Sequence, residues 1–292
     1  MLIIRLAGGL GNQIFQLGSA LLLAKANKIN KIGVDLSGLQ AYEAKHINQL
    51  PIFFDFKNID VTVEMRKFSI CKLRLPRLLS FTSSKLSLVN DNNFEKILKK
   101  KSKFLLLDGY FQTCLNQESF DNQLKILKPF FNNQALSHND GCIIHIRGGD
   151  FVAFWKTYES DKAFYINAIK KMKNDCGTKK FYVVTDDKNY ANIVLKDVNF
   201  SFIGGGFKED FYLIGQYKHR ILSSSSFALW ASALSNNNAS HVLVPKEFTP
   251  GVFRDFLLPN ESVVHEYVCP AMSVYSEEES TVSRLGNDSY LD

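Results

Sequence analysis

Cysteine is scarce in this chain, and its distribution excludes several kinds of protein. The 292 residues include five cysteines, an odd number, scattered without a CxxC pair. That distribution argues against a disulfide framework and against a structural zinc site, and it suits a reducing compartment. We expect most of these residues to act as small buried hydrophobic side chains. They are Cys71, Cys114, Cys142, Cys176 and Cys269.

Long apolar runs are missing as well. No stretch approaches the ~18 consecutive apolar residues of a transmembrane helix. The first residues lack the basic region, apolar core and cleavage site of a signal peptide. The sequence therefore predicts a cytoplasmic protein.

Positive charge is in modest surplus, with a formal net charge of +6. Part of it lies in the lysine-rich run 99–103, for which two interpretations stay open. One is a solvated helix end, and the other is a peripheral contact with the inner face of the membrane or another polyanion. Aromatic residues do not interleave with this run as they do on a nucleic-acid platform, so no nucleic-acid partner is expected.

What the sequence does have is a repeated alternation of strand and helix. Its 46% hydrophobic residues can form a substantial core, and the alternation predicts an α/β fold with parallel sheets. The polar stretch 132–141 marks a junction, so we expect Rossmann-like domains over 1–138 and 139–267, and a poorly ordered tail over 268–292. Residues 36–100 give no clear pattern. The expected strands are 2–6, 31–35, 104–107, 142–146, 181–185, 200–203, 220–222 and 241–244, and the expected helices are 12–26, 122–127, 162–173, 189–195, 211–218 and 226–234.

A glycine-rich turn follows the first strand. Gly9 and Gly11 stand where backbone N–H groups and a helix N-terminus can face an anion. A dinucleotide site is the rival interpretation, favoured by Asp35 at the end of the next strand. Against it, a full GxGxxG pattern would need a small residue at Ile14. A structural turn without a ligand also stays open.

The central motif runs from His145 to Asp150 and is more specific. A β-branched strand ends in His-x-Arg, and two glycines and a carboxylate follow. His145 and Arg147 are two residues apart on the strand and point to one face. The guanidinium of Arg147 suits a diphosphate, and Asp150 would lie within reach of an acceptor hydroxyl. The alternative is an internal Arg147–Asp150 ion pair that stabilises the turn.

Two further motifs follow strands in the second half. The pair Asp186–Asp187 could hold a metal, but no third ligand is evident nearby, and a helix N-cap at Asp187 is favoured. The serine run 223–226 followed by Phe227 lies where a strand meets a helix, which suits either an anion site or plain capping.

In this order, the motifs resemble those of the glycosyltransferase family 11 fucosyltransferases, which form α1,2-fucosyl linkages. The family opening GGLGNQ-F-Q corresponds to residues 8–16, and its HxRRGD motif to residues 145–150, with Gly148 in place of the second arginine. Its SSF motif and following tryptophan correspond to residues 225–227 and Trp230, and an acidic–aromatic segment to 209–213. The similarity covers about residues 1–245.

The resemblance implies a GT-B architecture, with two Rossmann-like domains facing across a cleft, and the following roles. His145 and Asp210 would contact guanine or its ribose, and Arg147 the β-phosphate. Ser225, Ser226 and Phe227 would contact the diphosphate. Gly9, Gly11 and Asn12 would approach phosphate or fucose from the first domain, with Asn12 counted beside Arg147 and Asp150 as catalytic. Gly148 removes one cation compared with relatives.

The predicted reaction is inverting transfer of L-fucose from GDP-β-L-fucose to the 2-hydroxyl of a terminal galactoside, without a metal or other cofactor. A β-galactoside oligosaccharide, lipid-linked or free, is the expected acceptor, in surface polysaccharide or O-antigen synthesis. Three alternatives stay open: a fucosyl linkage of another kind (α1,6 or O-linked to peptide), an NAD-binding oxidoreductase, and a non-catalytic carbohydrate-binding protein.

Overall fold

The computed structural model describes most of the chain. Asp150 and the segment 268–292 lie outside the described residues, so the predictions made for them stay predictions. The described residues are 1–40, 47–58, 62–66, 86–99, 102, 104–132, 139–149, 158–236, 239–245, 247, 254–258 and 260–264.

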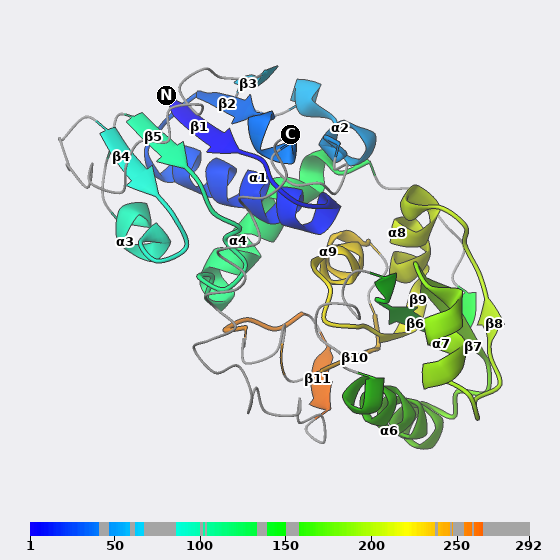
Figure 1. The fold of residues 1–292 in the computed structure, drawn as a ribbon. Helices are drawn as coiled ribbons and strands as arrows, with labels where there is room; N and C mark the ends of the chain where they lie inside the picture. Colours follow the sequence, from blue (N-terminus) through cyan, green and yellow to red (C-terminus); the bar gives the residue numbers. More distant parts are fainter. Residues whose placement is uncertain are drawn as a thin grey trace, which may run out of the picture.

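The first half of the chain builds a five-stranded parallel sheet in the order β3-β2-β1-β5-β4 (Figure 1). The central strand β1 is apolar and buried over its first three residues, as a strand covered on both faces must be. The strands are β1 (Leu2–Arg5), β2 (Lys31–Asp35), β3 (Thr62–Arg66), β4 (Leu86–Val89) and β5 (Phe104–Leu107), and the helices are α1 (Leu10–Ala26), α2 (Leu50–Phe53), α3 (Phe94–Leu98) and α4 (Gln117–Leu127), with 3-10 turns at Ser37–Gln40, Phe56–Asn58 and Lys128–Phe130.

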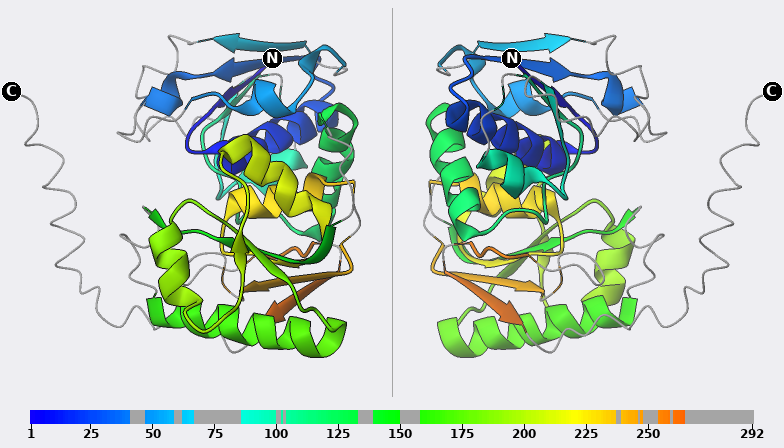
Figure 2. Two further views of the ribbon diagram at one scale, coloured as in Figure 1. Left: turned by 90° about the vertical axis from the view of Figure 1, so that its right-hand side faces the viewer. Right: turned by 90° about the vertical axis from the view of Figure 1, so that its left-hand side faces the viewer.

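The second half builds a six-stranded parallel sheet in the order β11-β10-β9-β6-β7-β8. Helices α6 and α7 pack on one face, and α8 and α9 pack on the other. Figure 2 shows α6 on the side of this sheet that lies away from the first half. The strands are β6 (Asn139–Ile146), β7 (Phe181–Thr185), β8 (Ser201–Phe202), β9 (Tyr217–Ile221), β10 (His241–Pro245) and β11 (Glu261–Val264), and the helices are α6 (Tyr158–Cys176), α7 (Lys188–Val194), α8 (Phe207–Gln216) and α9 (Ser226–Leu234).

One hydrophobic cluster runs from the first half into the second. Trp230 on α9 is fully buried and meets Phe15 of α1 with ring centroids 4.9 Å apart and Phe120 of α4 at 5.4 Å. Phe53 of α2 meets Phe211 of α8 at 4.8 Å. Such aromatic contacts bury large apolar areas. Helices α8 and α9 of the second half therefore pack against the first half as well as against their own sheet.

The structure corrects several boundaries and adds strands that the sequence did not reveal. The helix expected at 211–218 is Phe207–Gln216, because it begins four residues earlier behind Gly206 and passes straight into β9. The junction expected at 132–141 is partly strand: β6 begins at Asn139, with a register shift around Gly141 (φ +105°). β3, β4 and β11 were not predicted. Among the described residues, no helix is long and apolar enough to cross a membrane.

Candidate functional site

The glycine turn after β1 brings the start of α1 against the start of α9. Gly8 has φ +74°, which favours glycine, and Gly9 caps α1 with extended backbone. At Gly11, an added Cβ would lie 2.3 Å from the carbonyl carbon of Ser226 and 2.5 Å from the nitrogen of Phe227. Gly11 is therefore required for the close approach of the two backbones.

Asn12 links the two halves through its side chain. Its Oδ1 accepts a hydrogen bond from the Ser226 hydroxyl at 2.9 Å and another from the amide of Gln112. Gln112 carried no recognisable signal in the sequence. The structure thus shows Asn12 of α1 in contact with α9. The contact with phosphate or fucose that the sequence predicted for Asn12 stays a prediction.

His145 is buried near the carboxyl end of β6. Its Nδ1 lies 2.8 Å from the Ser223 hydroxyl, and its backbone oxygen accepts from Tyr165 at 3.1 Å. Its ring lies 5.9 Å from that of Phe227. Burial first, and the charge of Arg147 second, lower the pKa of His145 to about 3, so its imidazole is neutral at physiological pH. A neutral ring can orient a hydroxyl or a base, but it adds no charge to the site.

Arg147 lies just beyond β6 and has a partner that the sequence did not suggest. Its guanidinium forms an ion pair with Asp186, and the other oxygen of that carboxylate accepts the Gly148 N–H at 2.7 Å. The side chain of Arg147 is 37% exposed. Asp186 follows β7, the neighbour of β6 in the sheet, so the two carboxyl ends meet at one edge. The ion pair predicted as an alternative, Arg147–Asp150, includes a residue outside the described part of the chain.

The acidic residues at this edge divide into two roles. Asp187 accepts from the Tyr190 N–H at 2.9 Å and caps α7, which confirms the predicted cap. Asp210, in the first turn of α8, accepts from the Gly205 N–H at 3.2 Å. Burial raises the pKa of Asp210, and the nearby carboxylates Glu209 and Asp186 raise it further. Burial and these two carboxylates thus favour the protonated form of Asp210.

The serine run connects β9 to α9 and divides its hydroxyls among different partners. Ser223 bonds to His145, Ser226 donates to Asn12, and Ser224 donates to the backbone oxygen of Glu247 at 2.8 Å. Ser225 is the N-cap of α9, yet its side chain makes no capping hydrogen bond, and the first turn of α9 holds no acidic residue. The plain capping interpretation is therefore not met at Ser225, and the positive end of the α9 dipole is not offset within its own first turn.

A pocket lies beside the serine run and is lined in part by a second arginine. Ser223 and Ser225 line it together with Glu247 and Arg254. Arg254 is held by a buried bidentate pair with Glu261, at 2.7 and 3.3 Å. No motif in the sequence pointed to Arg254, because its partner lies on the unpredicted strand β11.

The arrangement gathers a histidine, a guanidinium, two helix N-termini and several hydroxyls at the carboxyl ends of two Rossmann-like sheets. Open α/β sheets bind ligands at this edge, and helix N-termini favour anions.

Comparison with known proteins gives the family. The model for "Glycosyl transferase family 11" matches residues 1–251, and the chain belongs to this family. It is 25% identical to an α-1,2-colitosyltransferase of Escherichia coli, covering 84% of this chain and 91% of that protein. It is 24% identical to the O-antigen biosynthesis glycosyltransferase WbnK of Escherichia coli, covering 84% and 94%.

A solved structure agrees on the fold. The chain superimposes on the NodZ α-1,6-fucosyltransferase soaked with GDP-fucose with a TM-score of 0.53 and 16% identity, over 80% of this chain and 91% of that one. NodZ comes from Bradyrhizobium. The predicted family and the GT-B fold are confirmed. Because the chain belongs to a glycosyltransferase family, the alternative of an NAD-binding oxidoreductase is contradicted.

Proposed function

We propose that the protein transfers L-fucose from GDP-β-L-fucose to the 2-hydroxyl of a terminal β-galactoside, with inversion and without a metal. The observation that carries the proposal is the position of Arg147 just beyond β6, because the neighbouring strand β9 leads through the serine run into α9, whose first turn contacts that of α1. A fixed guanidinium and two helix dipoles stabilise a departing diphosphate electrostatically, a task that a divalent ion performs in other enzymes.

In this proposal the acceptor hydroxyl attacks C1 of fucose from the face opposite GDP, while Arg147 neutralises the leaving diphosphate. Asp186 orients Arg147 through their ion pair and holds the Gly148 N–H as well. Neutral His145 and Asp210 are proposed to contact guanine or its ribose. Ser225, Ser226 and Phe227 are proposed to contact the diphosphate, and Asn12 fixes the geometry between the halves.

The names of relatives support the linkage and the setting of the reaction. One is an α-1,2-transferase and another acts in O-antigen biosynthesis, so we propose an α1,2 linkage and a polysaccharide acceptor, which a lipid could carry in the cytoplasm at the inner face of the membrane.

The experiment is an incubation with GDP-fucose, EDTA and a panel of β-galactosides, with product linkage and anomeric configuration read by NMR. We expect α-linked fucose at the galactose 2-hydroxyl in the presence of EDTA. Transfer to another position would replace the linkage, and transfer that requires added Mg²⁺ or Mn²⁺ would contradict the metal-independent mechanism.

A second donor is favoured by one observation, the similarity to a colitosyltransferase. Colitose is the 3-deoxy analogue of L-fucose, so both sugars present the same leaving diphosphate and differ by one hydroxyl. Running the same assay with the guanosine diphosphate of each sugar separates them. A kcat/KM at least about tenfold higher for the colitose donor, which corresponds to about 1.4 kcal/mol, would reassign the donor.

The general base is proposed to be Asp150. A positioned base contributes about 10²–10⁴-fold to the rate, so Asp150→Asn should lower kcat by at least about 100-fold. GDP affinity should stay near that of the wild type because the diphosphate contacts are untouched. Single-turnover kinetics with saturating donor measure the effect, and near-normal turnover in a folded variant would move the base elsewhere.

A further inference from the structure

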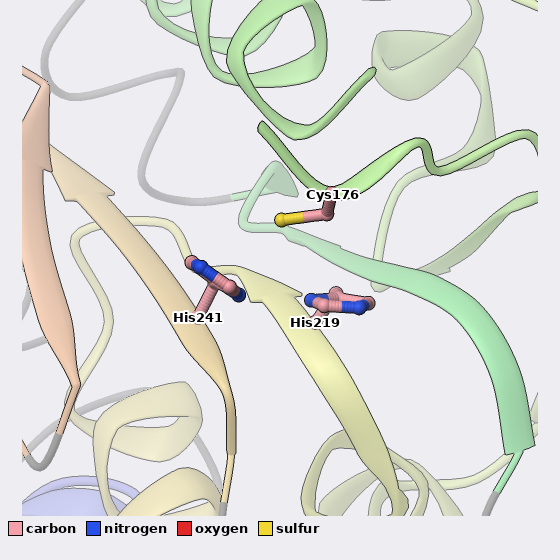
Figure 3. Close-up of side chains that lie close together, drawn as sticks. All are labelled: Cys176, His219 and His241. Atoms are coloured by element: carbon pink, nitrogen blue, oxygen red, sulfur yellow. The ribbon is translucent and has the colours of Figure 1, made fainter. Parts of the chain in front are cut away.

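A second cluster of reactive side chains lies at the opposite end of the second sheet from the serine run. Cys176 is the last residue of α6, His241 is the first residue of β10, and His219 lies on β9. Figure 3 shows the three side chains around one space between α6 and the two strands. Their ligand atoms, one sulfur and two nitrogens, all lie within 4.8 Å of one another.

The sheet register explains why the two histidines meet. His219 pairs with His241 on one side and with Cys142 on the other, so all three side chains project from the same face. Cys142 is fully buried in the core beneath α6, which identifies that face. The imidazole rings of the histidines lie 5.3 Å apart.

The end of α6 delivers the sulfur. Gly177, with φ +63°, follows Cys176 and ends the helix, and its N–H donates to the Lys173 oxygen at 3.1 Å. The thiol of Cys176 lies 4.0 Å from the thioether sulfur of buried Met172, so a second soft group stands behind the first.

His219 has an atom that the rest of the described structure leaves unsatisfied. Its Nδ1 is buried and has no hydrogen-bond partner among the described residues. Buried polar atoms are nearly always paired, so an orphan atom beside a thiol and a second imidazole calls for an explanation. A bound cation supplies one.

We propose that Cys176, His219 and His241 bind a zinc ion, with a water as fourth ligand on the side where His241 is exposed. Zinc prefers sulfur and imidazole nitrogen in a tetrahedron, with bonds of about 2.3 and 2.0 Å. Those bonds place ligand atoms about 3.5 Å apart, so side-chain rotations that move them by about 1 Å close the site. A metal such as Mg²⁺ or Ca²⁺ is excluded, because it requires oxygen ligands.

The zinc ion would fasten the end of α6 to β9 and β10 and would take no part in sugar transfer. Metal-independent catalysis and a structural metal are therefore compatible in one chain. The site escapes sequence inspection because its ligands come from three elements and show none of the short spacings of a zinc motif.

The test uses full-length protein freed of any histidine tag, kept reduced with a phosphine, and stripped with a chelator. Titration with Co²⁺ should give one ion per chain, a thiolate-to-cobalt charge-transfer band and the intense visible bands of four-coordinate cobalt. Cys176→Ser should abolish the charge-transfer band. Cys114→Ser, which alters a partly buried thiol in the first half, should leave it unchanged.

Zn²⁺ affinity measured by competition with a chromophoric chelator gives the magnitude. Loss of an outer-shell partner costs about 10–100-fold in metal affinity, so loss of a direct ligand in His241→Asn should cost at least about 100-fold. His241 is exposed, so its replacement should leave the fold intact, which circular dichroism verifies. Wild-type affinity no better than that of His241→Asn, or a charge-transfer band that persists in Cys176→Ser, would overturn the site.

Discussion

At the scale of single residues, two arginines of the second half differ in exposure and in their partners. Arg147 lies at the edge of the sheet, is partly exposed and forms an ion pair with Asp186. Arg220 is 1% exposed and donates to three backbone oxygens, of Tyr217 at 2.7 Å, Ser232 at 3.0 Å and Gly215 at 2.7 Å. The guanidinium of Arg147 lies at the surface of the proposed site, and that of Arg220 connects β9 to α8 and α9.

Arg147→Met should weaken GDP binding with little effect on folding. Truncating one partner of a buried charge pair costs about 2–5 kcal/mol, and the lower end applies because Arg147 is 37% exposed. About 2 kcal/mol corresponds to a Kd about 30-fold higher. Calorimetric titration with GDP measures it, and Lys31→Met, which alters an exposed pair with Glu64 in the first half, is the control. Unchanged GDP affinity would contradict the proposed role.

Arg220→Met should lower the free energy of unfolding, whereas Arg147→Met should mainly weaken GDP binding. Each buried acceptor left without a donor costs about 1–3 kcal/mol, so the total loss should be at least about 3 kcal/mol. Urea denaturation measures it, with Arg147→Met as the matched control, whose loss should stay below about 1 kcal/mol as for other surface pairs. Equal losses in both variants would show that Arg220 is not the structural arginine.

The sequence distinguished these residues only in part. His-x-Arg at the end of a β-branched strand marked Arg147 as a ligand contact, and the alternation of strand and helix placed it at the right edge. Its ion pair with Asp186 was not predicted, because pairing across neighbouring strands depends on the sheet order, which local patterns do not record. Arg220 and Arg254 had no signal, since their acceptors are backbone atoms or an unpredicted strand.

At the scale of elements, the decisive contact is that between the first turns of α1 and α9. Both helices were predicted almost residue for residue, because their apolar periodicity and the preceding glycine or serine run are local signals. That the two N-termini touch was not predictable. Gly11 was predicted to approach phosphate or fucose, and the structure shows that it leaves room for the backbone of Ser226.

Gly11→Ala should therefore act on both stability and turnover. A Cβ 2.3 Å from a backbone atom cannot be accommodated by a rotamer change, so the two helices must separate. Overpacking of this kind costs about 1–3 kcal/mol of unfolding free energy. Gly205→Ala is the control, because the nearest atom there is 4.0 Å away at the end of the Glu209 side chain. A Gly11→Ala protein with wild-type stability and kcat would contradict the contact.

At the scale of the whole molecule, the alternation of elements predicted two parallel sheets, and motif order predicted the family and the GT-B fold. The failures concentrate in the first half between residues 36 and 100, where β3 and β4 lie. Strand β4 has only four residues, and its pairing with β5 comes from the sheet, not from a periodic pattern of its own. Short strands of this kind are decided by tertiary contacts.

The stability of the whole chain should depend on pH through His145. The unfolded histidine has a pKa of about 6.5 and the folded one of about 3. Between these values only the unfolded chain binds the proton, so acid favours unfolding. From about pH 7 to about pH 5 this single group should cost about 2 kcal/mol. Urea unfolding in EDTA at both pH values, with His145→Gln expected to lose that difference, provides the measurement. An equal pH dependence in the variant would refute it.

Trp230 belongs to α9 of the second half yet rests in aromatic contacts with α1 and α4 of the first. Neither half of the chain therefore has a complete hydrophobic core of its own. Heating should therefore unfold the molecule in a single cooperative transition. A fragment that contains one sheet alone would expose these aromatic side chains to solvent and should aggregate.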